Sequence, residues 1–363
     1  MATELATTTP TSMNKGDGEY SYSQNSQLQR NGVELIKVLI KQGIAENLDL
    51  AQLFSSSSPK SFKIVDLGCS VGRNTFTAVQ NIIQSVKLKY QTLSGSSKVA
   101  LEFQVFFNDL ASNDFNTLFK NLPLDRKYFC AAVPGPFQGR LFPEKSIHFI
   151  HSSFALHWLS NAPKELMDRH SPSYNKGRIY YPSAPKEVSK AYATQFGKDI
   201  GAFLDARAQE VVHGGLMAIL ILCIPDGVPY SQCYVLELYE LLGTSISDMA
   251  NEGLISEDKV DSFNLPIYNP TEKELKALIE KNACFSIEKM EPIHPTWNSD
   301  IRLVVLHFRA AWEGLVSDHF GNDIIDDLFD RLLKKVMASH VFTDSTCYEL
   351  IVQLFVLLKR NDA

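Results

Sequence analysis

The sequence predicts an α/β fold: a doubly wound, mostly parallel, Rossmann-like sheet with a helical cap over the carboxyl ends of its strands. Two observations lead to this prediction. From Phe62 onward, near-continuous apolar segments of strand length alternate with segments of helical spacing, which is typical of parallel sheets covered on both faces. After Pro225 the alternation stops, and helical patterns follow one another without strands between them.

Three segments precede the expected sheet. We expect residues 1–18 to be disordered, because this Thr-rich start contains no apolar core. Residues 31–48 carry apolar side chains at helical spacing, which indicates a helix. The serine-rich residues 55–61 are typical of a linker.

The expected core consists of residues 19–225 and 284–363. Its strands are expected at Phe62–Leu67, Leu101–Phe107, Tyr128–Ala132, Ile147–Ser152, Leu216–Ile224, Phe285–Lys289 and Tyr348–Leu358. Its helices are expected from Thr75 to about Lys89, over Lys186–Val212, and near residues 302–315 and 323–337.

Residues 226–283 form the expected cap. Helical patterns cover residues 232–243, 245–253 and 271–282. Thr271 and Glu274 have the spacing of a capping box, in which each residue satisfies a free backbone N–H of the other.

Composition excludes several classes of function. The chain has 363 residues, of which 45% are hydrophobic, which supports a sizeable core. A net charge of −6 without a basic run argues against nucleic acid as a partner. No apolar run reaches the roughly 18 residues of a membrane span. The six cysteines lack C-x-x-C spacing, which predicts reduced thiols and a cytoplasmic location.

The turn after the first strand is the most informative segment. Asp66 lies at the strand end, and Gly68 and Gly72 follow with G-x-x-x-G spacing. Glycine lets a backbone approach a ligand closely, but the middle glycine of the dinucleotide fingerprint G-x-G-x-x-G is missing. A nucleoside with an amino-acid tail, S-adenosylmethionine (SAM), therefore fits better than a dinucleotide. The alternative is a tight strand-to-helix turn that binds nothing.

Asp109 ends the next expected strand. In doubly wound folds an acidic residue at this place holds the ribose hydroxyls. The alternative, that Asp109 caps the following helix, is weakened because Asn113 and Asp114 can serve as caps equally well.

Three more segments are expected near the strand ends. Tyr22, Ser26 and Gln29 fall on one face of a helix, which is also the pattern of an ordinary solvated helix. Phe137, beside a Pro-Gly turn, suits an adenine face or a position in the core. His157 and Trp158 follow an apolar strand and small hydroxyl residues, and each combines an apolar ring with an N–H donor.

Together these motifs resemble the SABATH family of plant methyltransferases, which act on small carboxylic acids and on xanthines, with most similarity to its loganate branch. The resemblance covers the chain from about Met13 onward. It rests on Ser-Tyr-Ser-x-Asn-Ser-x-x-Gln, Asp-Leu-Gly-Cys-Ser-x-Gly-x-Asn, Phe-Asn-Asp-Leu, Asn-Asp-Phe-Asn, Pro-Gly-x-Phe-x-Gly-Arg-Leu-Phe-Pro and His-Ser-Ser-x-x-Leu-x-Trp-Leu-Ser.

The resemblance implies roles for individual residues. The implied SAM-binding residues are Tyr22, Ser26, Asp66, Gly68, Cys69, Asn74, Asp109, Leu110, Pro136, Phe137 and Ser153. The implied acceptor-binding residues are Gln29, Phe154, His157 and Trp158, of which Gln29, His157 and Trp158 are the catalytic candidates. Some relatives carry Mg²⁺, and the matching positions are Asn175, Asp261, Phe263 through its carbonyl, and Asn264. A homodimer is implied as well.

Three residues depart from the family pattern. Arg73 replaces a usual Pro, which changes the charge and stiffness of the glycine loop. Pro136 stands where the family often has Ser, so a hydroxyl contact to the adenosine moiety of the cofactor is lost. Phe154 replaces the Tyr of most carboxyl-methylating members, which favours a more apolar acceptor or one held differently.

The predicted reaction is methyl transfer from SAM to the carboxylate of a small plant acid. A carboxylate is ionised at pH 7 because its reference pKa is about 4, so it needs no general base. The alternatives are N-methylation of a purine such as a xanthine, a nucleotide-dependent dehydrogenase, and a protein that binds the cofactor without catalysis.

Overall fold

A seven-stranded sheet forms the centre of the computed structural model, which describes residues 8–54, 61–94, 101–294, 300–342, 347 and 352–362. The strand order is β3-β2-β1-β4-β5-β7-β6. β1 to β5 pair in parallel, whereas β7 is antiparallel to both β5 and β6. The strands are β1 Ser61–Leu67, β2 Glu102–Asp109, β3 Phe129–Pro134, β4 Ile147–Ser153, β5 Val211–Cys223, β6 Phe285–Ile293 and β7 Val352–Arg360. The predicted fold class is confirmed.

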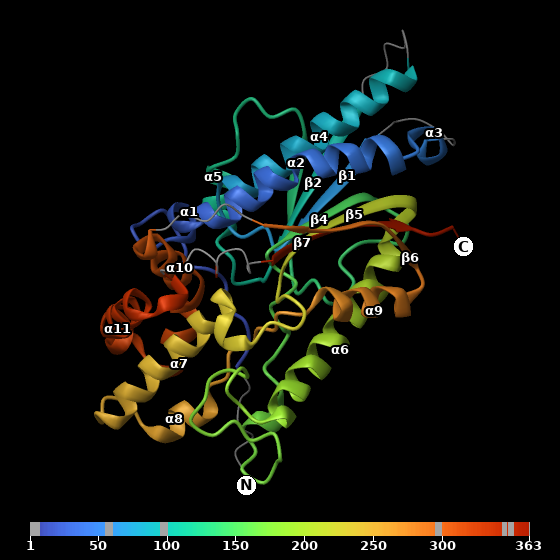
Figure 1. Ribbon diagram of the computed structural model, residues 1–363. Coiled ribbons are helices and arrows are strands. Elements are labelled where there is room, and N and C mark those ends of the chain that lie inside the picture. The colour runs from blue at the N-terminus through green and yellow to red at the C-terminus, as the bar shows by residue number, and fades with distance from the viewer. Residues whose placement is uncertain are drawn as a thin grey trace.

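Helices cover both faces of this sheet (Figure 1). α2 and α4 lie on one face, and α6 and α9 on the other. The helices are α1 Tyr22–Asn25, α2 Gln27–Asn47, α3 Leu50–Leu53, α4 Arg73–Ser94, α5 Phe115–Lys120, α6 Lys186–Glu210, α7 Tyr234–Asn251, α8 Glu257–Ser262, α9 Glu272–Asn282, α10 Ile301–Phe320 and α11 Ile325–Ala338.

α2 lies close to the sheet because its apolar residues fall on one side of the helix. Val33, Ile36, Ile40 and Ile44 are buried at spacings of three or four residues, the pattern of an amphipathic helix. On the same side, a Cβ on Gly43 would lie 2.3 Å from Cδ2 of Leu357 in β7. The absent side chain at Gly43 therefore permits this close packing.

The cap differs from the expectation for residues 226–283. α7, α8, α10 and α11 gather at one end of the molecule (Figure 1), and α10 and α7 both pack against α11. α9 instead packs against α6 and β6, although its predicted capping box at Thr271 and Glu274 is confirmed. The cap therefore includes α10 and α11, which the sequence pattern had placed in the core.

α7 is one helix where two were expected. The break was expected at Gly243, which lies inside the helix. A Cβ on Gly243 would lie 3.0 Å from Cγ1 of Ile179. A packing contact, and not a helix end, therefore explains this glycine.

The expectation of disorder up to residue 18 is wrong for residues 8–18. Thr8 is buried, and its carbonyl accepts a hydrogen bond of 2.9 Å from the backbone N–H of Ala162. The backbone N–H of Asn14 donates to the carbonyl of Ala310 at 2.9 Å. Residues 1–7 lie outside the described residues, as do the expected linker up to residue 60 and the expected start of the last strand at Tyr348.

Within the described residues, none of the helices is both long enough and apolar enough to span a membrane.

We predict opposite effects for the same substitution at two helical glycines. Gly43→Ala should lower the free energy of unfolding by about 1–2 kcal/mol, because overpacking against the buried Leu357 outweighs the gain in helix propensity. Gly201→Ala in α6, where a Cβ would meet nothing within 4 Å, should raise it by about 0.5–1 kcal/mol. Urea denaturation of both variants checks this, and equal shifts would contradict the packing argument.

Candidate active site

The glycine turn between β1 and α4 approaches the loop that follows β4. Gly68 has a φ of +76°, and a Cβ there would lie 2.4 Å from Cβ of Ala155. Only glycine combines this backbone conformation with such a close neighbour. The backbone N–H groups of Gly68 and Cys69 both donate to the carbonyl of Asn108, at 2.9 Å each. The turn is therefore fixed to the end of β2.

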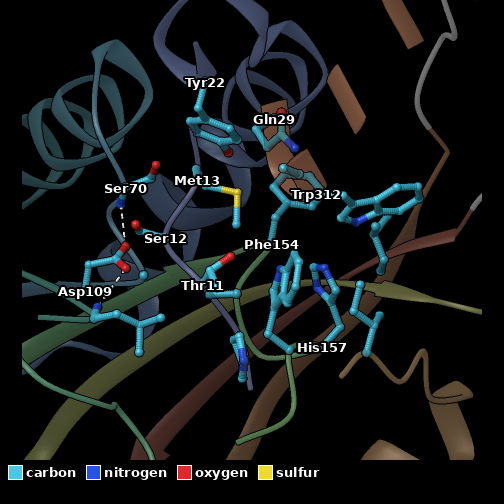
Figure 2. Close-up of a pocket in the computed structure, with 18 of the residues that line it drawn as sticks. Thr11, Ser12, Met13, Tyr22, Gln29, Ser70, Asp109, Phe154, His157 and Trp312 are labelled. Atoms are coloured by element: carbon cyan, nitrogen blue, oxygen red, sulfur yellow. Dashed lines mark hydrogen bonds between the residues drawn. The ribbon is translucent and has the colours of Figure 1, made fainter. Parts of the chain in front are cut away.

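Asp109 presents its carboxylate beside this turn (Figure 2). Oδ2 accepts from the backbone N–H of Ser70 at 2.7 Å, and Oδ1 accepts from that of Leu110 at 2.8 Å. Burial raises the pKa of Asp109 to about 6, although these two hydrogen bonds lower it. Each oxygen keeps a second lone pair, so the carboxylate can also accept a pair of vicinal hydroxyls.

Asp66 is used differently. Its Oδ1 lies 2.7 Å from Nδ1 of the buried His151, and its Oδ2 accepts from the hydroxyl of Thr75. Asp66 thus ties the ends of β1, β4 and α4 together. It lines a small recess that adjoins the main cavity, together with Cys69 and Asn74.

A buried ion pair holds the loop that contains Phe137. Nε of Arg207 lies 2.8 Å from Oε2 of Glu210, and both side chains are completely buried near the end of α6. The guanidinium of Arg207 donates to the carbonyls of Phe137 and Gly139 at 2.8 and 2.7 Å. Because removing one partner of a buried pair strands the other charge, the position of Phe137 depends on this pair.

The main cavity has a volume of about 270 Å³. Figure 2 shows Asp109 and Ser70 at one end and His157 with Trp312 at the other. The predicted site residues that line it are Tyr22, Gln29, Gly68, Asp109, Leu110, Pro136, Phe137, Ser153, Phe154, His157 and Trp158. One cavity thus contains both the residues expected at the cofactor and those expected at the acceptor.

A chain of hydrogen bonds orients Gln29. Nδ1 of His307 lies 2.9 Å from the carbonyl of Asn25, which can only accept, so Nδ1 carries the proton. Nε2 of His307 then accepts from Nε2 of Gln29, 2.8 Å away. One amide hydrogen of Gln29 stays available, and its Oε1 is buried without a partner.

Both cavity histidines are neutral near pH 7. Burial lowers the pKa of His157 to about 3. Burial also lowers the pKa of His307 to about 4, against the opposing effect of its bond to Asn25. The described residues that line the cavity include no lysine or arginine, and Asp109 is their only carboxylate. None of them could therefore form an ion pair with an anionic ligand.

Phe154 packs its ring against α2. It has a φ of +54°, and its backbone N–H donates to the carbonyl of Leu220 at 2.8 Å. A Cβ on Gly32 would lie 2.6 Å from Cζ of the Phe154 ring. The ring therefore uses the space that a side chain at residue 32 would fill.

Ser26 lies outside both cavities. It is buried, and its carbonyl accepts from Nδ2 of Asn74 at 3.1 Å. Its contribution is to position Asn74, which lines the recess. A direct contact between Ser26 and the cofactor stays a prediction.

The four expected Mg²⁺ ligands lie away from the cavity. Oδ1 of Asp261 accepts from the backbone N–H of Gly177 at 2.8 Å, and its Oδ2 from the hydroxyl of Tyr174 at 2.5 Å. Oδ1 of Asn264 accepts from Nδ2 of Asn175 at 2.8 Å, and Phe263 is buried. These three oxygens already have partners within the protein, whereas Oδ1 of Asn175 is buried without one. Among the described residues no group of three His, Cys, Asp or Glu has a metal-binding arrangement.

Several residues that the sequence patterns did not single out also line the cavity. They are residues 9–13, His307, Phe308, Trp312, Tyr239 and Gln353. The segment at 9–13 has a Thr-rich, featureless composition, so no local pattern marked it. The others lie in ordinary helices and a strand whose apolar spacing indicated only core.

Comparison with known proteins agrees with the motifs. Residues 8–361 match the family described as SAM dependent carboxyl methyltransferase. Loganic acid O-methyltransferase of Catharanthus roseus is 46% identical over 96% of this chain and 94% of its own. Paraxanthine methyltransferase 2 of Arabidopsis thaliana is 38% identical over 98% of this chain and 100% of its own.

A solved structure of loganic acid methyltransferase with S-adenosylhomocysteine (SAH) has the same fold. Its TM-score is 0.91 at 44% identity, and the match covers 96% of this chain and 99% of that one. The chain therefore belongs to the SAM-dependent carboxyl methyltransferases, the SABATH family that its motifs resemble.

Proposed function

We propose that this enzyme methylates the carboxylate of a small acid, of the kind represented by loganic acid, to give a methyl ester. The observation that supports this is the uncharged acceptor end of the cavity. Gln29 and Trp158 offer N–H donors, and His157 and His307 are neutral. Such donors can hold an ionised carboxylate without a strong ion pair that would lower its reactivity.

In this proposal SAM lies between the glycine turn and the loop that contains Phe137. Asp109 accepts the ribose hydroxyls, Phe137 and Pro136 contact the adenine, and Tyr22, Ser153 and the recess around Asn74 hold the amino-acid tail. SAM, when bound, supplies a methyl group on a positively charged sulfur. Ser70 Oγ is buried without a partner beside Asp109, so an unused polar atom is available there.

The residues of the chain then act by positioning. Gln29 and Trp158 donate hydrogen bonds to the carboxylate oxygens. Phe154 and His157 contact the rest of the acid. Alignment of this kind can account for about 7–11 kcal/mol of a barrier. Because a carboxylate is ionised at neutral pH, no residue has to remove a proton.

N-methylation of a purine is the second candidate. The ring of Phe154 gives a planar base a surface for stacking, and a paraxanthine methyltransferase is among the relatives at lower identity than the loganic acid enzyme. An assay with labelled SAM decides between carboxyl methylation and N-methylation. It tests a panel of carboxylic acids and a panel of xanthines side by side. Methyl ester formation supports the proposal, and N-methylated xanthines without esters overturn it.

Two finer expectations have their own tests. The homodimer is implied by the family resemblance, and light scattering tests it. The cytoplasmic location follows from the scattered cysteines, and fractionation of tissue tests it. We assign no step to Mg²⁺, because the oxygens of Asp261 and Asn264 have internal partners.

Loss of either carboxylate donor should lower catalysis. We expect Gln29→Met and Trp158→Phe each to reduce kcat/KM for an accepted acid by about 10- to 100-fold, since a hydrogen bond to a charged group contributes about 1.5–3 kcal/mol. Gln27→Met, at an exposed position on the same helix, is the matched control and should retain wild-type kinetics. Wild-type values in both donor variants would contradict the assignment.

Binding of SAM should weaken in acid. The pKa of Asp109 is raised to about 6, so the ionised form that accepts ribose hydroxyls is complete above pH 7 and is lost below pH 6. We expect the Kd to rise about tenfold between pH 8 and pH 5, because each pH unit below the pKa reduces the ionised fraction about tenfold. Calorimetry on the wild type and on Asp109→Asn separates this effect from the titration of SAM itself, and parallel pH profiles would refute it.

The acid should bind better beside a charged cofactor analogue. Two opposite charges about 4 Å apart attract by about 4 kcal/mol at an effective dielectric constant of about 20, and the described cavity residues supply no cation of their own. Sinefungin carries a protonated amine where SAM carries its sulfonium, whereas SAH has an uncharged thioether there. We expect an accepted acid to bind at least about tenfold more tightly with sinefungin than with SAH. The primary amide of the same acid should show no difference, and equal Kd values for the acid would count against the model of a neutral site.

A further inference from the structure

Gln353 places an unused hydrogen-bond acceptor in the wall of the cavity. Its side chain is 3% exposed, it lines the cavity, and its Oε1 is buried without a partner. It is the second residue of β7, paired in register with Leu222 of β5 and Ile293 of β6. A buried polar atom of this kind is costly unless it is satisfied, so a ligand that supplies a donor would be favoured here.

Gln353 and Phe154 meet at the same point on α2. A Cβ on Gly32 would lie 3.0 Å from Oε1 of Gln353 and 2.6 Å from Cζ of Phe154. The amide oxygen and the para carbon of the ring therefore both border the same glycine of α2. Where a relative carries Tyr in place of Phe154, its hydroxyl would extend from this carbon and could satisfy the oxygen from within the protein.

We propose that Gln353 recognises a hydroxyl group on the body of the acceptor, so that the enzyme selects hydroxylated cyclic acids over their deoxy analogues. This rests on the proposed carboxyl methylation. Gln29 lies one helical turn before Gly32 on α2, so the carboxylate donor and the hydroxyl acceptor belong to the same wall. A rigid acid can contact both, and the ring of Phe154 supplies the apolar surface between them.

The chemistry of Gln353 sets the expected discrimination. Its oxygen accepts a hydrogen bond from an alcohol, whereas a C–H group in the same place leaves it unsatisfied. A site built to bond a hydroxyl discriminates against the analogue without it much more strongly than a site that only loses apolar contact. For one neutral hydrogen bond and one stranded acceptor we expect a preference of roughly 10- to 100-fold in kcat/KM.

The test uses the full-length enzyme with matched pairs of acids. Cyclohexanecarboxylic acid is compared with its 3- and 4-hydroxy derivatives. Cinnamic acid is compared with its meta- and para-hydroxy derivatives. The wild type should prefer at least one hydroxylated member. Gln353→Met should abolish this preference, which is measured as the ratio of the kcat/KM values within each pair of acids. Gln209→Met, at an exposed position on α6, is the control and should keep it.

A second variant tests the idea without removing Gln353. Phe154→Tyr supplies an internal donor, so it should reduce the preference for hydroxylated acids even if Gln353→Met folds poorly. A wild type that methylates acids without any preference, or a preference that survives in both variants, overturns the inference and leaves carboxyl methylation intact. A wild type that methylates no acid but does methylate xanthines overturns the proposed function, and the inference with it.

Discussion

The site depends on the hydrogen bonds of one buried residue, Asn108, at the end of β2. Its backbone carbonyl accepts from the N–H groups of Gly68 and Cys69, and its side-chain Nδ2 donates to the carbonyls of Val133 and Gly135 at 2.7 and 2.9 Å. The glycine turn and the loop before Phe137 are thus fixed to the same residue, the turn through its peptide carbonyl and the loop through its side-chain amide. Asp109 is the next residue, so its carboxylate lies between two loops whose spacing is already set.

The second general property of the site is the lack of charge at its acceptor end. Burial keeps His157 and His307 neutral, and the hydrogen bond from His307 to Asn25 leaves Nε2 of the imidazole as an acceptor. Neutral donors suit a reaction in which the nucleophile is already ionised. A lysine or arginine in the same place would bind the acid more strongly, but it would stabilise the ground state at least as much as the transition state.

The sequence predicted those parts of the site that follow from local patterns. The turn at Gly68, the carboxylate of Asp109 and the pair His157–Trp158 each lie at or shortly after the end of a parallel strand. The carboxyl ends of such strands meet at one edge of the sheet. Gln353 was missed because β7 runs antiparallel to β5. The first residues of β7, and not its last, therefore reach that edge. His307 was missed because it contacts Gln29 across 278 positions of the chain. Neither a strand direction nor a contact of that range is encoded in local spacing.

The acceptor end of the cavity joins distant parts of the chain. Gln29 and Asn14, near the beginning, bond to His307 and Ala310 in α10. The residues expected at the cofactor, in contrast, all lie between Tyr22 and Ser153. Translation therefore produces every residue expected at the methyl donor before it produces α10, which completes the wall around the acceptor. A nascent chain without α10 would have the elements that bind the methyl donor but no complete wall to select what receives the methyl group.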